Sequence, residues 1–220
     1  MNTLGKIIKS YIFYTLCALG ISLSIIANVG VSSFNSMNLS LANANDIKIG
    51  TVTIFFNITF LLIYMILTKF AYKYKYLIQA FSVFMFGTLI NYFTYNILGG
   101  ITDLSYIQGI FVFTGGTLII GLSIGMIIHY NIITFPMENL CIKISEMSKI
   151  SFIKLRYSVD IISVSISISV SLMNGLPIYV REGTLISIIF LSSTINFSKN
   201  YAEKKKKDKI LPFPENFKNT

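Results

Sequence analysis

The chain has 220 residues, of which 54% are hydrophobic and 12% are charged, and its mean hydropathy is +0.70. Since a soluble domain carries about 25% charged residues, this composition excludes an ordinary soluble domain and favours a membrane protein. The net charge of +9 is also typical of proteins that bind nucleic acid. The basic residues, however, lie at the ends of apolar segments, so we expect no nucleic-acid partner.

Six segments poor in charged residues predict membrane helices, because a span needs about 20 mostly apolar residues. Runs this long and continuous do not fit the alternating strands of a membrane barrel, which are about ten residues each. We therefore predict an all-α membrane protein. The spans are expected at about 8–28, 49–68, 77–97, 106–129, 157–175 and 180–197.

The lysines and arginines fall almost entirely on one side of this six-helix arrangement. Only Lys48 and Arg181 lie on the other side. Cytoplasmic loops carry the excess of basic residues, so we predict a multi-pass protein of the bacterial cell membrane with both termini cytoplasmic. The segment Lys204–Lys209 is interpreted as a contact with anionic lipid. The basic tail, 199–220, is expected to be disordered.

Two polar stretches interrupt the apolar pattern. Asn28–Asn35 contains Gly, Asn and Ser residues that break a helix, and a short helix of about 11 residues is predicted at 34–44. In the second stretch, Pro136 suits a first helical turn and Glu138 suits the positive end of the helix dipole. Each stretch is either a capped connector on the membrane surface or a re-entrant half-helix that meets the other near the midplane.

The same polar pattern occurs twice in the chain. With a shift of 103 positions, the residues Asn28, Asn35 and Asn57 recur as Asn131, Glu138 and Asp160. Because each half holds three spans, the second half is predicted to be inverted relative to the first. We divide the chain into two three-helix repeats, 1–103 and 104–198, followed by the tail. Inverted repeats with broken helices are typical of transporters that bind their substrate near the midplane.

Arg156 and Asp160 are four residues apart and so face the same side of a helix. An acid inside a span is costly and is a functional candidate by default. Near the membrane surface, Arg156 would simply neutralise Asp160, so a structural pair and a solute pathway both stay open. The substrate-binding site is predicted to comprise Asn35, Asn57, Glu138, Arg156 and Asp160.

Residues 163–171 alternate between Ser and Val or Ile, which by itself is a strand pattern. A single strand leaves its backbone groups unsatisfied in lipid. We therefore expect a helix over this segment.

Sequence motifs for catalysis are absent. The chain has no G-x-S-x-G, H-E-x-x-H or Walker A motif. It contains one histidine, His129, and two cysteines without partner spacing, Cys17 and Cys141, which provide neither a metal site nor a disulfide framework. We predict a protein that is not an enzyme and that uses no metal and no cofactor.

The stretch Asn28–Asn35 (N-V-G-V-S-S-F-N), the later segment 183–186 (G-T-L-I) and the tandem arrangement resemble the YczE/YyaS/YitT family of bacterial integral membrane proteins. The resemblance covers about residues 12–197. The family pattern prefers Pro and Asp at the positions of Ser33 and Asn35. Because this family is largely uncharacterised, the resemblance implies a multi-pass membrane protein and no particular activity.

These observations together predict a permease-like protein that binds or moves a small solute or an ion at a site between the repeats. Two alternatives stay open. The protein could be a regulatory or assembly partner that transports nothing, or the substrate-capturing subunit of an energy-coupled importer. The identity of any protein partner does not follow from the sequence.

Overall fold

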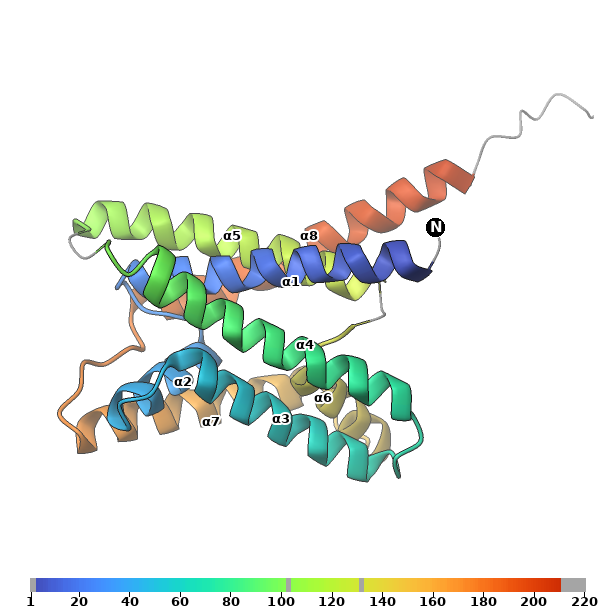
Figure 1. Ribbon diagram of the computed structural model, residues 1–220, viewed down its shortest axis with the longest axis horizontal. Helices are drawn as coiled ribbons and strands as arrows, with labels where there is room; N and C mark the ends of the chain where they lie inside the picture. Colours follow the sequence, from blue (N-terminus) through green and yellow to red (C-terminus); the bar gives the residue numbers. More distant parts are fainter. Residues whose placement is uncertain (1–2, 102–103, 131–132, 211–220) are drawn as a thin grey trace, which may run out of the picture.

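The computed structural model describes residues 3–101, 104–130 and 133–210, which form helices without any strand. Figure 1 shows α1, α5 and α8 in one layer and α2, α3, α6 and α7 in another. Helix α4 crosses between the layers and packs against both α1 and α3. The bounds are α1 Thr3–Ile26, α2 Ser33–Ala44, α3 Ile49–Leu67, α4 Lys73–Asn91, the π-helix η1 Tyr92–Ile97, α5 Tyr106–Tyr130, α6 Pro136–Ser148, α7 Phe152–Met173 and α8 Glu182–Ile210.

Five helical segments of the described chain are long and apolar enough to cross a membrane, and they coincide with the first five predicted spans. The sixth predicted span lies inside α8, which is not among these five. The five segments are Gly5–Ile26, Ile49–Leu67, Lys73–Ile97, Tyr106–Tyr130 and Phe152–Met173.

The prediction of a disordered tail from residue 199 onward is wrong for its first part, because α8 continues to Ile210. The segment that follows the apolar part of α8 is rich in Lys, which is a good helix former. Extending an existing helix also avoids the cost of starting a new one. Residues 211–220 lie outside the described residues.

The exterior of the molecule is apolar along the helices, as a surface in contact with lipid requires. Large exposed side chains include Phe55, Ile66, Leu77, Phe111 and Ile161. Polar side chains are instead buried between helices, among them Ser22, Asn38, Gln79, Ser123 and Thr184. A soluble protein has the opposite distribution, so the structure agrees with the membrane class that the composition predicts.

The segment 163–171 is part of α7, so the prediction of a helix is confirmed. Ser163, Ser167 and Ser171 are buried on one face of α7. This helix packs against α2, which buries several serines of its own. Small side chains at such positions let helix backbones approach closely.

Glycines make two further close helix contacts. A Cβ atom on Gly20 of α1 would lie 2.7 Å from the carbonyl oxygen of Gly116 on α5, and one on Gly116 would lie 2.8 Å from that of Gly20. Gly50 of α3 and Gly87 of α4 face each other in the same manner. The backbones at both crossings are therefore closer than any other residue allows.

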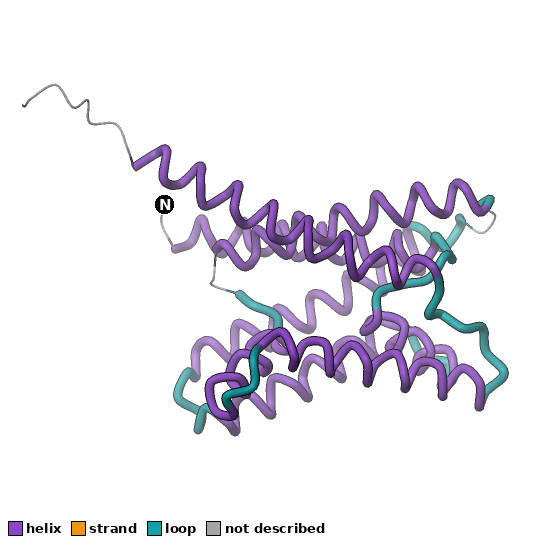
Figure 2. The backbone as a smooth tube through the Cα atoms, turned by 180° about the vertical axis from the view of Figure 1, so that it is seen from behind, coloured by secondary structure: helices purple, strands orange, loops and turns teal. Residues whose placement is uncertain are grey.

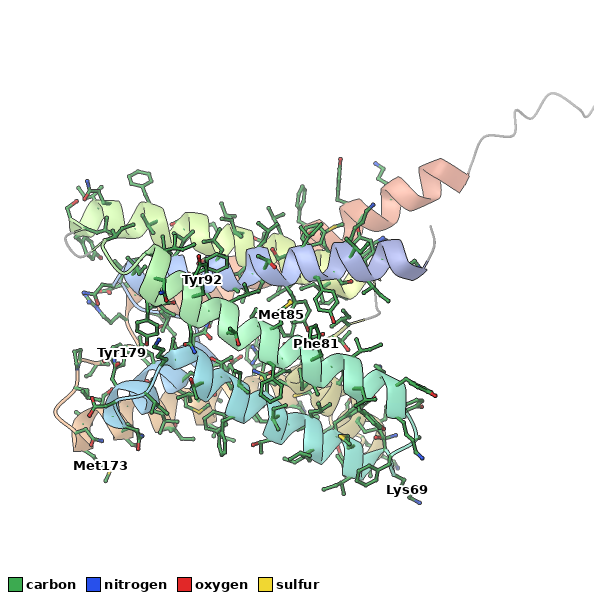
Figure 3. All side chains as sticks on the ribbon, in the orientation of Figure 1. Lys69, Phe81, Met85, Tyr92, Met173 and Tyr179 are labelled. Atoms are coloured by element: carbon green, nitrogen blue, oxygen red, sulfur yellow. The ribbon has the colours of Figure 1, made fainter. Side chains whose placement is uncertain are left out.

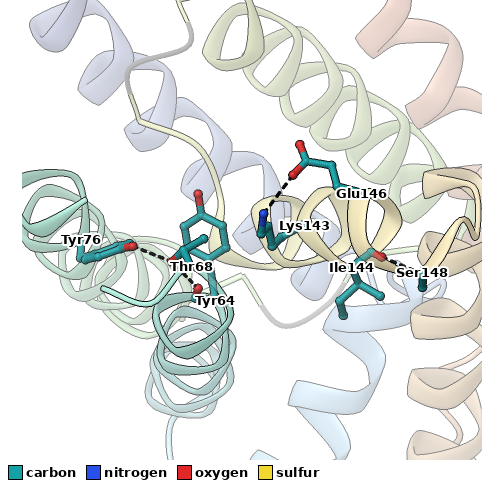
Figure 4. Close-up of polar contacts among 7 residues, drawn as sticks. All are labelled: Tyr64, Thr68, Tyr76, Lys143, Ile144, Glu146 and Ser148. Carbon is teal, nitrogen blue, oxygen red and sulfur yellow. Dashed lines mark hydrogen bonds and ion pairs between the residues drawn. The ribbon is translucent and has the colours of Figure 1, made fainter. Parts of the chain in front are cut away.

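Lys69, at the turn from α3 to α4, and Met173, at the end of α7, lie at opposite ends of the molecule (Figure 3). At the Lys69 end, Thr68 Oγ1 donates to the Tyr64 carbonyl oxygen and lies 2.6 Å from the Tyr76 hydroxyl (Figure 4). The connections from α1 to α2 and from α7 to α8 cross between the layers (Figure 2).

Candidate functional site

Two short helices, α2 and α6, begin inside the molecule. Helix α1 ends at Ile26, and the chain then turns through Asn28 with φ 51° and Gly30 with φ 106°. With 12 and 13 residues, α2 and α6 are about 18–20 Å long at about 1.5 Å per residue. A bilayer core is about 30 Å thick, so neither helix is long enough to span it.

A cavity of about 100 Å³ lies at the first turns of α2 and α6. Four of the five residues predicted for the substrate site line it, from four different helices. The structure thus brings together residues that are more than 100 positions apart in the sequence. The four are Asn35, Asn57, Glu138 and Arg156.

Asp160, the fifth predicted residue, does not line the cavity. Arg156 Nη1 donates to Asp160 Oδ1 at 2.8 Å, one turn away on α7. The two side chains are 29% and 23% exposed. Asp160 is therefore connected to the cavity through Arg156, whose positive charge it neutralises.

Asn35 and Glu138 each occupy the third position of a short helix, α2 and α6 respectively. Asn35 is 8% exposed, and in the described part of the chain its side chain has no hydrogen-bond partner. The Oε2 atom of Glu138 is buried and is likewise without a partner among the described residues. Since buried polar groups are normally hydrogen-bonded, these two side chains are available to a ligand.

Asn57 on α3 is held by its own helix. Its Nδ2 donates to the carbonyl oxygen of Thr53 at 2.9 Å. Thr53 also lines the cavity, and its hydroxyl accepts from Asn38 Nδ2 of α2 at 3.2 Å. This network joins α2 to α3 beside the cavity, which Asn57 also lines.

The rest of the cavity wall is largely apolar and aromatic. Phe34, Phe86, Phe113 and Phe135 line it. The ring of Tyr14 stacks on the ring of Phe135 with centroids 4.6 Å apart, and this contact helps to hold the Phe135 ring in place. Several lining residues come from α1, α5 and α8, and sequence reasoning missed them because their spacing signals only helix packing.

A second cavity, of about 210 Å³, lies between the loop after α1 and the segment before α8. Arg181, directly before α8, donates from Nη1 to the carbonyl oxygen of Asn28 in this loop at 2.9 Å. Asn43 of α2 donates to the hydroxyl of Tyr179. Asn131, the predicted counterpart of Asn28, lies outside the described residues.

Within the described ranges, no group of three or more His, Cys, Asp or Glu side chains comes together in a way that could hold a metal ion. The candidate site is therefore built from amides, hydroxyls, one carboxylate and one guanidinium. These groups suit the binding of a small polar molecule or a monovalent ion by hydrogen bonds and charge.

A family model described as a family of unknown function (DUF6198) matches residues 5–200 of the chain. No curated protein and no solved structure matches it. The match supports the expectation of a family without established activity, but it does not name the YczE/YyaS/YitT group.

Proposed function

Because this chain belongs to a protein family of unknown function, we propose its function from the geometry of its cavity. The protein is a six-span permease of the bacterial cell membrane that binds a small solute or ion between two inverted repeats. In this proposal α1–α4 form the first repeat and α5–α8 the second, and α8 is the sixth span. Both termini are cytoplasmic, and kinship with the YczE/YyaS/YitT group is part of the proposal.

The pattern of helix contacts supports the repeat. Helix α2 packs against α7, and its counterpart α6 packs against α3. In the same way α1 packs against α4 and α5 against α8, while α1 and α5 pack against each other. The contact between α3 and α4 has no counterpart of similar extent among the described residues.

A matched pair of hydrogen bonds supports it further. The Thr184 hydroxyl on α8 donates to the carbonyl oxygen of Val31, two residues before the start of α2, at 2.6 Å. The Gln79 amide on α4 donates to the carbonyl oxygen of Thr134, two residues before the start of α6, at 3.2 Å. Val31 and Thr134 are 103 positions apart, which is the shift of the sequence repeat. The last helix of each half thus secures the loop that enters the short helix of the other half.

The placement of the short helices favours half-helices over surface connectors. Figure 1 shows α2 in the left half and α6 in the right half of their layer, and each runs from the interior toward its own end of the molecule. Their first turns meet at the same cavity. Half-helices whose positive ends point at a midplane site are a recurrent feature of secondary transporters.

The charge distribution favours the proposed orientation. Lys69 lies at the end of the molecule that also holds the N-terminus and the end of α8 (Figures 1 and 3). The predicted cytoplasmic side carries nearly all the basic residues, as the positive-inside rule expects. The lysine-rich end of α8 would then contact anionic lipid of the inner leaflet.

The observation that carries the proposal is the convergence of Asn35, Asn57, Glu138 and Arg156 on one cavity. A purely structural role would pair these side chains with protein groups, because unsatisfied buried polar atoms are costly. Instead, the buried Oε2 atom of Glu138 has no partner in the described part of the chain. This arrangement favours a solute-binding protein over a partner protein that transports nothing.

The proposal is tested by uptake into proteoliposomes that contain the purified chain. The panel comprises radiolabelled amino acids, vitamins, nucleobases and monovalent ions. We expect uptake of at least one solute, and its loss in Glu138→Gln. The matched control is Glu146→Gln, which removes a carboxylate of the same helix that is exposed and paired with Lys143. Co-purification with an ATPase pair and no uptake by the chain alone would instead indicate a capture subunit.

A further inference from the structure

We propose that the solute of this cavity is a small zwitterion of the α-amino-acid type, with its carboxylate at the start of α2 and its ammonium group at Glu138. The inference rests on the proposed permease function and adds the chemical class of the substrate. It follows from the different chemistry of the two half-helix ends at the cavity.

The start of α2 is a donor end without an anion. Its first turn contains no acidic residue, and the preceding Ser32 makes no side-chain cap. The first backbone N–H groups of a helix have no partner within the helix and, with the helix dipole, favour an anion. Asn35 stands beside them, 8% exposed and unpartnered among the described residues. A carboxylate placed here would accept from the backbone and from the Asn35 amide.

The start of α6 is an acceptor end. Its first turn already carries an anion, Glu138. The carboxylate lines the cavity, and its buried Oε2 atom has no partner among the described residues. An ammonium group placed here would donate to Oε2. The same atom would repel a second anion, so the two ends are not interchangeable.

The charges around the cavity sum to about zero. The starts of the two half-helices contribute about +0.5 elementary charge each. Together they balance the negative charge of Glu138. Arg156 and Asp160 balance each other as an ion pair. A lone cation or a lone anion would leave an uncompensated charge in a region of low dielectric, which is costly. A zwitterion keeps the sum unchanged and satisfies both ends.

The size of the cavity limits the side chain of the ligand. A space of about 100 Å³ exceeds the roughly 10–15 Å³ that one water needs by the same measure, and bulky phenylalanine rings form part of its wall. Small amino acids such as glycine, alanine, serine and proline fit this description. Apolar rings next to a charged pole also suit an aliphatic carbon chain between the two charged groups.

The test uses L-alanine and its two half-molecules as probes of the purified full-length protein. Ethylamine keeps the ammonium group and propionate keeps the carboxylate. Each is added at increasing concentration, with glycine, serine and proline in parallel, and the unfolding temperature is measured. We expect one or more of the amino acids to raise it, and neither half-molecule to do so at a tenfold higher concentration.

Two variants assign the ends. Glu138→Gln should weaken amino-acid binding at least tenfold. Asn35→Asp places an anion at the start of α2, so it should lose amino-acid binding and gain binding of ethylamine. Glu146→Gln should behave as the wild type. Retained amino-acid binding in both cavity variants would overturn the assignment.

The outcomes separate this inference from the proposed function. Stabilisation by propionate alone or by ethylamine alone would overturn the zwitterion and leave a permease for an anion or a cation. Stabilisation by a vitamin, a nucleobase or an ion that is lost in Glu138→Gln would likewise overturn the zwitterion but support a binding site at this cavity. Failure of every solute to bind would overturn both proposals.

Discussion

Asn35 and Glu138 lie 103 positions apart in the sequence, occupy the same third position of two short helices and line one cavity. One is neutral and the other is acidic. The cavity therefore has related geometry at its two ends and different chemistry. In the proposed permease, this asymmetry would give the bound solute a preferred orientation.

The close crossing of α1 and α5 predicts that alanine substitution affects stability differently at the neighbouring residues Gly115 and Gly116. Gly116→Ala should lower the free energy of unfolding by about 1–3 kcal/mol, because the new methyl group would overpack against Gly20. A Cβ atom on Gly115 meets nothing within 4 Å. Gly115→Ala should therefore be neutral or stabilising, by up to about 1 kcal/mol. Thermal unfolding in detergent measures both, and equal effects would contradict the close crossing.

The two hydrogen bonds to loop carbonyl oxygens that support the proposed repeat should have similar effects on stability. Thr184→Val and Gln79→Ala each remove a donor to a carbonyl oxygen of a loop that enters a short helix, so each should cost about 1–3 kcal/mol. Thr88→Val is the control, since Thr88 is exposed and bonds only within its own helix. A large loss in one variant and none in the other would indicate that the halves are not equivalent at these loops.

The ion pair between Arg156 and Asp160 predicts a separation of stability from binding. Asp160→Asn should lower the unfolding temperature and weaken solute binding, because it leaves the guanidinium unneutralised next to the cavity. The double variant Arg156→Gln, Asp160→Asn should recover part of the stability, since no charge is left without a partner. It should not recover binding, because Arg156 itself lines the cavity. Full recovery of binding in the double variant would show that the pair is structural.

The proposed orientation predicts opposite labelling of two introduced cysteines. A membrane-impermeant thiol reagent should label Lys69→Cys only from the cytoplasmic side and Met173→Cys only from the outer side. The native Cys17 and Cys141 are both buried, so their background should be low. Labelling of both positions from one side would exclude a membrane orientation in which the helices run across the bilayer.

Much of this fold could be predicted from the sequence, because lipid makes length and apolarity decisive. The start of α3 at Ile49 and the short helix at 34–44 were within a residue of the structure. The end of α8 could not be predicted in this way, since the charged segment after residue 199 resembles a disordered tail and yet extends a helix.

The candidate site, too, could be predicted from the sequence only in part. Polar residues at the shift of the repeat were visible as a pattern, and four of the five predicted residues line the cavity. The aromatic wall and the contribution of Thr117 and Ser187 were not visible, because such residues are common in membrane helices and only tertiary packing turns them toward the cavity. Asp160 pairs with Arg156 but does not line the cavity, and the spacing of four residues alone does not distinguish these two roles.

The most direct test of the central claim is solute-induced thermal stabilisation of the purified protein across amino acids, vitamins, nucleobases and monovalent ions. A ligand that binds only the folded state raises its apparent stability by mass action. We predict at least one solute that stabilises the wild type and Glu146→Gln but not Glu138→Gln. A solute that stabilises all three proteins equally, or the absence of any stabilising solute, would contradict a binding site between the repeats.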